Sequence, residues 1–122
     1  LMIERINGWC DEHNLARPSS KGEYMVAIYR GLARAYQKAI KDLEEVIKTK
    51  FTSLYIIGGG CKNEILDQWT ATLTGLTVYA GPVEATALGN LVVQAWATGE
   101  LSDLQEGRDR IRSEQKVKVF LP

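Results

Sequence analysis

The chain has 122 residues, of which 45% are hydrophobic and 25% charged, and its fifteen basic residues balance fifteen acidic ones. This length suits one globular domain with a sizeable core. Because the basic residues are scattered and the net charge is zero, composition argues against a nucleic-acid-binding protein and against recruitment to anionic membranes. No apolar run reaches the length of a membrane-spanning helix.

Metal-binding and catalytic side chains are sparse. Cys10 and Cys61 match no metal-ligand spacing, and we expect free thiols in a reducing, cytoplasmic environment. His13 is the only histidine, so a zinc site or a Ser–His–Asp triad lacks partners. We expect no metal site in this chain.

The first half of the chain is predicted to be helical. Residues 1–14 predict a short helix, and residues 15–20 (LARPSS) a loop, because a proline disfavours helix in the residue before it. Ser20 and Glu23 have the spacing of a capping box. From there apolar residues recur with a helical period over about 29 residues, roughly 43 Å. So long a helix exceeds what a stand-alone domain of this size needs.

A strand–helix–strand unit follows. Residues 53–57 (SLYII) predict a buried strand, residues 63–74 a helix ending at Gly75, and residues 76–80 (LTVYA) a second strand. The two strands should lie parallel, joined by a right-handed crossover. Gly81–Pro82 marks the next turn.

The C-terminal part is predicted to contain two more helices. The first covers residues 83–98 and closes at Gly99, and Ser102 with Gln105 is a capping signature for the second, which ends near Arg112. Residues 116–120 alternate like a strand but equally fit an extended tail. Because two strands do not make an independent sheet, either the chain pairs with itself or further strands lie in another part of the protein. The start at Leu1 leads us to expect a longer parent.

Three consecutive glycines, Gly58, Gly59 and Gly60, connect the first predicted strand to its helix. A plain turn needs one or two, so three indicate close approach of a ligand to the backbone. Free N–H groups at the positive end of a helix dipole favour phosphate. The alternative is a tight turn whose glycines serve packing alone. Asn63 is placed to cap the helix or to hydrogen-bond a base.

The known nucleotide fingerprints fit this loop poorly. Nothing matches the P-loop pattern, and the dinucleotide pattern G-x-G-x-x-G begins at Gly58 and Gly60 but has Asn63 in place of the third glycine. The second predicted strand also lacks a terminal acidic residue to bind a ribose. Both departures count against NAD.

A second motif is AGPVEATALGN, residues 80–90. Glu84 falls in the first turn of the predicted helix, where a carboxylate suits the helix dipole. Ala85 and Gly89 are one turn apart and leave a bare face on which another helix can pack closely. Tight packing alone and a hinge between two lobes both fit this pattern.

Together, IGGGCKNEILDQW and GLTVYAGPVEATALGN resemble the C-terminal domain of the FGGY carbohydrate kinases, most closely the rhamnulokinase branch. PSSKGEYMVAIYRGLARAY extends the likeness more loosely over nearly the whole chain. The family belongs to the actin, Hsp70 and sugar kinase superfamily. The resemblance therefore implies an α/β, ribonuclease H-like fold, with residues 1–122 as the C-terminal portion and the N-terminal sugar-binding domain outside this chain.

The resemblance also implies roles for the two glycine motifs. It implies an adenosine-binding turn in which Asn63 lies against the adenine. The nucleotide-binding residues that it implies are Gly58, Gly59, Gly60, Cys61 and Asn63. The residues it implies for a connecting motif, at the hinge where two kinase domains close, are Gly81, Glu84, Ala85 and Gly89.

The implied reaction is transfer of the ATP γ-phosphate to a ketose hydroxyl, such as that of L-rhamnulose in rhamnose metabolism, with Mg²⁺ bridging the phosphates. The family's general base, sugar site and phosphate loops lie upstream of the matching region, so we expect no catalytic residue here and an inactive isolated chain. The aspartates are interpreted as solvated charges and helix-end partners: Asp11, Asp42, Asp67, Asp103 and Asp109.

Two alternatives to the kinase interpretation stay open from the sequence. One is a self-contained nucleotide- or dinucleotide-binding module, and the other is a non-catalytic interaction protein that kept the fold. The unpaired edge of the predicted sheet also leads us to expect that the isolated fragment associates with itself.

Overall fold

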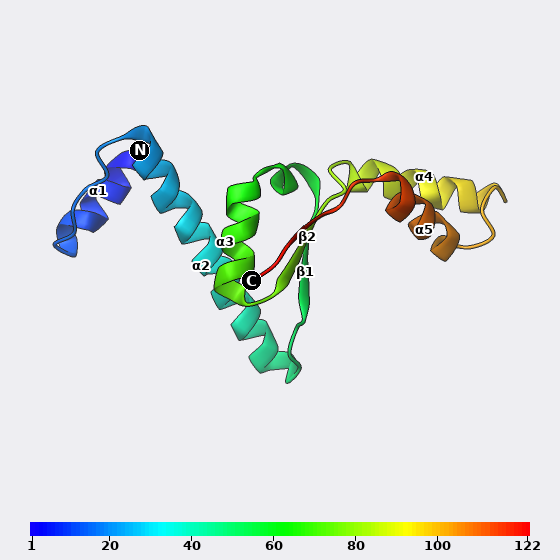
Figure 1. The fold of residues 1–122 in the computed structure, drawn as a ribbon, viewed down its shortest axis with the longest axis horizontal. Helices are drawn as coiled ribbons and strands as arrows, with labels where there is room; N and C mark the ends of the chain where they lie inside the picture. The colour runs from blue at the N-terminus through cyan, green and yellow to red at the C-terminus, as the bar shows by residue number, and fades with distance from the viewer.

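The computed structural model describes residues 1–122 and shows a mixed α/β fold, as the sequence predicts. The elements in chain order are α1 (Met2–Glu12), α2 (Lys21–Ile47), β1 (Ser53–Ile56), the 3₁₀ helix η1 (Gly58–Lys62), α3 (Glu64–Thr74), β2 (Thr77–Ala80), α4 (Ala85–Ala97), α5 (Leu104–Glu114) and β3 (Lys118–Phe120). The molecule is extended: α1 lies at one end, the sheet with α2 and α3 in the middle, and α4 with α5 at the other end (Figure 1).

The three strands form one sheet in the order β1-β2-β3. β1 and β2 are parallel, with Ser53 opposite Thr77 and Ile56 opposite Ala80, which confirms the predicted strand–helix–strand unit. β3 is antiparallel to β2. The C-terminal segment is therefore a strand and not a free tail, and β1 is left as an edge with one neighbour.

α2 begins at the predicted cap, with one change. The Oγ of Ser20 accepts a hydrogen bond from the Glu23 N–H at 3.2 Å. The Glu23 carboxylate does not return to Ser20 but accepts from the N–H and hydroxyl of Ser19, at 2.6 and 3.0 Å. The helix ends at Ile47, and its C-cap residue Lys48 is left-handed with φ 56°.

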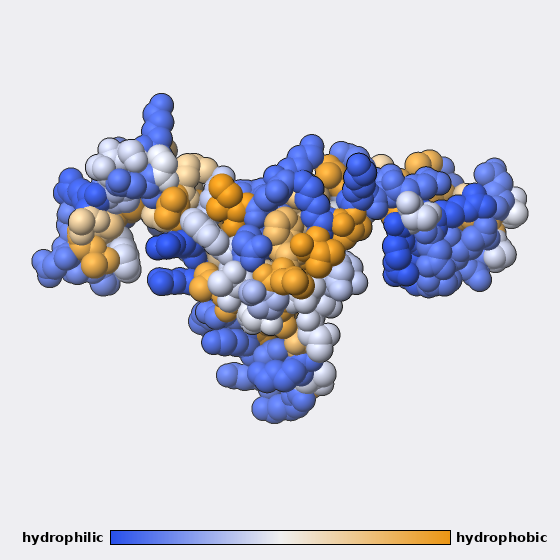
Figure 2. All heavy atoms as spheres, in the orientation of Figure 1, coloured by the Kyte–Doolittle hydropathy of each residue, from blue (hydrophilic) through white to orange (hydrophobic).

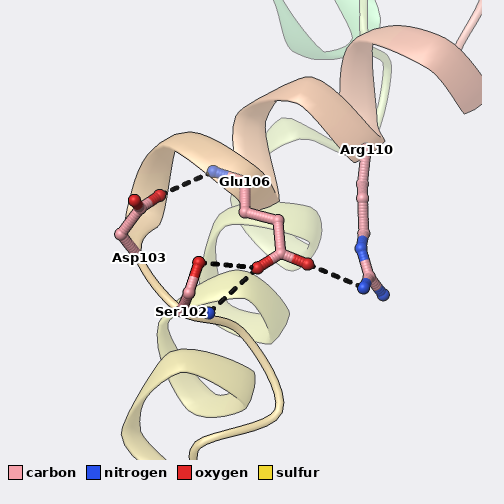
Figure 3. Close-up of polar contacts among 4 residues, drawn as sticks. All are labelled: Ser102, Asp103, Glu106 and Arg110. Carbon is pink, nitrogen blue, oxygen red and sulfur yellow. Dashed lines mark hydrogen bonds and ion pairs between the residues drawn. The ribbon is translucent and has the colours of Figure 1, made fainter.

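The predicted cap of α5, Ser102 with Gln105, is wrong by one residue. Asp103 is the N-cap, and its Oδ1 accepts from the Glu106 N–H at 2.8 Å. The Glu106 carboxylate accepts from the N–H and hydroxyl of Ser102, at 2.9 Å each, and from Arg110 at 2.8 Å (Figure 3). Serine and aspartate both cap helices. Here the aspartate caps the helix while the serine binds the glutamate, as Ser19 does at α2.

The buried core is small and centres on β2 and one face of α3. Val78 on β2 and Ala71 on α3 are fully buried, whereas Ala33 is the only buried residue of α2. Twenty large apolar side chains are exposed, including Leu43 and Val46 of α2. Apolar groups are visible on the surface over the central part of the molecule (Figure 2). None of the helices combines the length and hydrophobicity needed to span a membrane.

Candidate functional site

The three consecutive glycines form the start of η1, a 3₁₀ helix that separates β1 from α3. The sequence predicts a glycine-rich turn that leads directly into α3, whereas the structure has a short 3₁₀ helix there. Gly58 has φ 75°, a conformation that side chains disfavour, so its backbone requires glycine. A Cβ at Gly59 would meet nothing within 4 Å, and one at Gly60 would make only an ordinary 3.6 Å contact with Ile56. Packing within the chain therefore explains neither Gly59 nor Gly60.

The side chains that follow the glycines turn back onto the chain. Cys61 is buried, and its Sγ lies 2.9 Å from the Gly58 carbonyl oxygen, which places the thiol inside the turn. Asn63 is the N-cap of α3, and its Oδ1 accepts from the Leu66 N–H at 3.2 Å. The structure records no hydrogen bond for the Asn63 Nδ2, so this donor stays free while the oxygen caps the helix.

The two glycine motifs are joined by backbone hydrogen bonds. Gly58 donates its N–H to the Pro82 carbonyl at 3.1 Å, and Gly81 donates its N–H to the Ile56 carbonyl at 2.8 Å. Both motifs thus lie at the carboxyl ends of the parallel strands β1 and β2. In open α/β sheets this edge is where ligands bind.

Gly81 is required by the chain's own C-terminal segment. It is buried with φ 123°, and a Cβ there would lie 3.2 Å from the Lys116 carbonyl oxygen. The Gly81–Pro82 peptide bond is cis. The close approach that this glycine allows is therefore to the backbone leading into β3.

A basic cavity of about 270 Å³ lies between the two motifs. Three of its lining residues are lysines, Lys62 from η1 and Lys116 and Lys118 from the C-terminal segment, and Cys61, Ala80, Gly81 and Val83 complete it. Lys118 forms an ion pair with Glu64. The other two lysines form no ion pair within the chain, so the cavity is positively charged and suits an anion.

The helix of the second motif starts later than predicted. α4 begins at Ala85, so Glu84 is its N-cap residue rather than part of its first turn, and the side chain makes no capping hydrogen bond. Ala85 is half-buried and Gly89 is exposed, with nothing within 4 Å of a Cβ at Gly89. Because nothing in this chain contacts a Cβ at Gly89, close helix packing at this position stays a prediction.

The sequence analysis did not predict the burial of two residues, Gly107 and Asp67. A Cβ at Gly107 would lie 2.3 Å from Cγ1 of Val92, so the close packing of α5 on α4 depends on this glycine. Its signal was an isolated glycine inside a helical pattern. Asp67 is fully buried on α3, so its interpretation as a solvated charge is wrong. Burial and the neighbouring Glu64 raise the pKa of Asp67, and Lys118 opposes this.

The remaining aspartates match the prediction of solvated charges and helix-end partners. Asp11 pairs with Arg17, Asp42 with Lys38 and Asp109 with Arg112, while Asp103 caps α5. No group of three or more His, Cys, Asp or Glu side chains lies close enough together to hold a metal ion.

The fold and the site define an α/β protein with two glycine motifs at the carboxyl edge of a parallel strand pair. The model of the FGGY family of carbohydrate kinases, C-terminal domain, matches residues 2–98. The chain belongs to this family.

The chain is also similar to three bacterial rhamnulokinases. It is 46% identical to that of Oceanobacillus iheyensis over 91% of this chain and 24% of the relative. It is 42% identical to that of Bacillus subtilis over 99% of this chain and 25% of the relative. For Halalkalibacterium halodurans the identity is 39% over 98% of this chain and 26% of the relative. The chain thus spans about a quarter of the length of the relatives it matches.

Proposed function

We propose that this chain is the C-terminal, nucleotide-binding portion of an ATP-dependent sugar kinase that phosphorylates a ketose, with L-rhamnulose as the substrate. Family membership and similarity to rhamnulokinases support this proposal. In it, residues 1–122 belong to a ribonuclease H-like domain. The N-terminal sugar-binding domain, the general base and the phosphate loops lie in the rest of a cytoplasmic parent.

The observation that carries the nucleotide site is the open space at Gly59. This residue has neither a left-handed backbone nor a neighbour within 4 Å of a Cβ, so the chain itself does not require glycine there. A ligand in contact with the backbone does. As one of the first residues of η1, Gly59 also has no partner for its N–H within that helix. An adenine nucleotide fits these features.

The neighbouring residues have distinct proposed roles in this site. Gly58 holds the turn, and Gly60 leaves its backbone open to the ribose and phosphates. Cys61 contributes through its backbone, because its thiol faces the Gly58 carbonyl. The free Nδ2 of Asn63 is the donor toward adenine.

The second motif is proposed as the hinge of the parent enzyme. Gly81 fixes the motif to β1 through its 2.8 Å hydrogen bond to Ile56. Glu84 stands at the start of α4, and Ala85 and Gly89 present the bare face against which the other domain packs on closure. The hydrogen bond from Gly58 to Pro82 joins the segment that leads into α4 directly to the nucleotide turn.

ATP with Mg²⁺ supplies the phosphoryl group and charge neutralisation. The chain holds no cluster of metal-ligating side chains, so we assign Mg²⁺ to the nucleotide phosphates and to residues outside residues 1–122. A nucleotide half-site cannot align a sugar hydroxyl with the γ-phosphate, and alignment is a large part of this catalysis. The isolated chain is therefore proposed to be inactive.

A phosphorylation assay of the full-length parent with a panel of sugars tests this function. We expect ATP-dependent phosphorylation with the highest kcat/KM for L-rhamnulose over fuculose, xylulose, ribulose and glycerol, and none with the isolated chain. A parent that binds NAD and phosphorylates no sugar would establish the dinucleotide-module alternative. Preference for another ketose would overturn the assignment of L-rhamnulose as the substrate, but the assignment as a sugar kinase would stand.

A further inference from the structure

A mostly apolar cavity of about 280 Å³ lies beside the unpaired edge of β1, between α2 and α3. Tyr36 and Ile40 of α2 form one wall, and Leu54 and Ile56 of β1 form another. Gly60 of the glycine turn also lines it. The cavity therefore connects an open strand edge with the candidate nucleotide turn.

The one charged group that lines this cavity is the carboxylate of Asp67. Its side chain is fully buried, and neither carboxylate oxygen has a hydrogen-bond partner. Buried polar groups are almost always hydrogen-bonded, and a buried charge without a partner is strongly unfavourable. The other four aspartates of the chain all have partners. Asp67 thus lacks a partner that the site requires.

The charges nearby do not provide that partner. Glu64, one turn earlier on α3, carries the same charge as Asp67. Lys118 of β3 is the one cation acting on Asp67, and its amino group is engaged by Glu64. From α2 and β1 the titratable residues at the cavity are the tyrosines Tyr36 and Tyr55. A side chain that carries a positive charge and donates hydrogen bonds would satisfy both oxygens of Asp67 in its ionised form.

We propose that this cavity is the docking site for an arginine or lysine from the part of the parent polypeptide that lies outside residues 1–122. The charged end of this side chain pairs with Asp67, and its methylene stem packs against Tyr36 and Ile40. Long basic side chains combine these two properties. The proposal rests on the proposed function insofar as it requires a longer parent.

One observation favours this occupant over a second copy of the chain. The chain spans about a quarter of the length of its relatives, so most of the matching polypeptide lies outside it. The open edge of β1 leaves room for an extended segment directly beside Leu54 and Ile56. Because Gly60 lines the same cavity, the docked segment would also contact the glycine turn.

Carbon-13 NMR of the full-length parent, labelled at aspartate carboxyl carbons, tests the pairing. Asp67→Asn assigns the signal by removing it, and Asp67→Glu serves if the asparagine variant does not fold. An aspartate paired with a cation titrates below the usual value of about 3.9, which is the expected result. A titration at or above that value overturns the proposal.

Thermal unfolding of the parent gives a second test. Asp67→Leu leaves the docked cation buried without a partner, so we expect a lower melting temperature. Asp42→Leu removes an exposed ion pair on α2 and serves as the control, with no comparable decrease expected. A higher melting temperature for Asp67→Leu overturns the proposal.

The NMR titration also distinguishes a second copy of the chain as the occupant. A depressed Asp67 pKa that returns to normal when the protein is diluted identifies a second copy and overturns the proposal.

These readouts are independent of phosphoryl transfer. A parent that phosphorylates no sugar but shows a depressed Asp67 pKa overturns the proposed function and supports the docking site. An active kinase in which Asp67 titrates above its usual value overturns the docking site alone.

Discussion

Gly58 and Pro82 are 24 positions apart in the sequence, yet the Gly58 N–H donates to the Pro82 carbonyl at 3.1 Å. The return bond from Gly81 to the Ile56 carbonyl is 2.8 Å. The pair fixes both glycine motifs at one end of the β1–β2 pair. The proposed nucleotide turn and the proposed hinge motif are therefore joined directly through the backbone.

Gly59→Val is predicted to abolish nucleotide binding in the parent without unfolding it. A Cβ at Gly59 meets nothing within 4 Å in this chain, so the clash we expect is with the bound nucleotide. Calorimetric titration with ADP measures the loss. Gly8→Val, on α1 and equally free of neighbours, is the matched control and should bind normally. Unchanged ADP affinity in a folded Gly59→Val protein would refute the assignment of the turn.

The sequence predicts the strand–helix–strand unit well because its signals are local. β1, α3 and β2 are each defined by their own side chains, by the Asn63 cap and by Gly75, which is left-handed with φ 72°. The α5 cap was misplaced because Ser102 and Asp103 are both good cap residues. The choice between them depends on the hydrogen bonds of Glu106, whose carboxylate binds Ser102 and whose N–H binds Asp103.

The features that the sequence left open or predicted wrongly depend on tertiary contacts. The strand β3 exists because β2 offers it a partner, and the Lys116 backbone then makes a glycine necessary at position 81. Gly107 matters only because Val92 lies opposite it. Asp67 is buried because it lies on the face of α3 that is turned toward α2 and the sheet. A single sequence records none of these distances.

Gly89→Leu is predicted to affect the parent and not the isolated chain. Within residues 1–122 nothing lies within 4 Å of a Cβ at this exposed position, so we expect the isolated chain to accommodate the leucine. In the parent, the leucine would overpack the contact between α4 and the other domain, at a cost of about 1–3 kcal/mol. Urea unfolding and turnover of both forms measure the difference. Wild-type stability and turnover in the parent would contradict the hinge assignment.

Gly107→Ala is predicted to destabilise the chain by about 1–3 kcal/mol through overpacking. The added Cβ would lie 2.3 Å from Val92 Cγ1 and 2.9 Å from Cγ2, and a β-branched side chain has little freedom to move away. Val92→Ala in the same protein removes both methyl groups and should restore much of the stability. Urea unfolding of the single and double variants measures this coupling. Additive effects in the double variant would show that the two residues do not compete for space.

Asp67 is predicted to give the isolated chain a stability that falls as pH rises. Its pKa is raised by burial and by Glu64, so the folded chain keeps this proton to a higher pH than the unfolded chain, where the pKa is about 3.9. The contribution is therefore complete below the unfolded pKa and is lost as pH rises through the folded pKa. Carboxylates with lowered pKa values, such as Glu23 and Glu106, have the opposite dependence.

Asp67→Leu isolates this contribution, because the opposing carboxylates are common to both proteins and cancel in the difference. At neutral pH the leucine variant of the isolated chain should be more stable by about 1–3 kcal/mol, since a buried carboxylate without partners is removed. Urea unfolding between pH 4 and 8 should show this advantage growing with pH. In the parent, where a docked cation would hold Asp67 ionised, the sign should reverse. An advantage of equal size at every pH would mean that Asp67 does not titrate with folding.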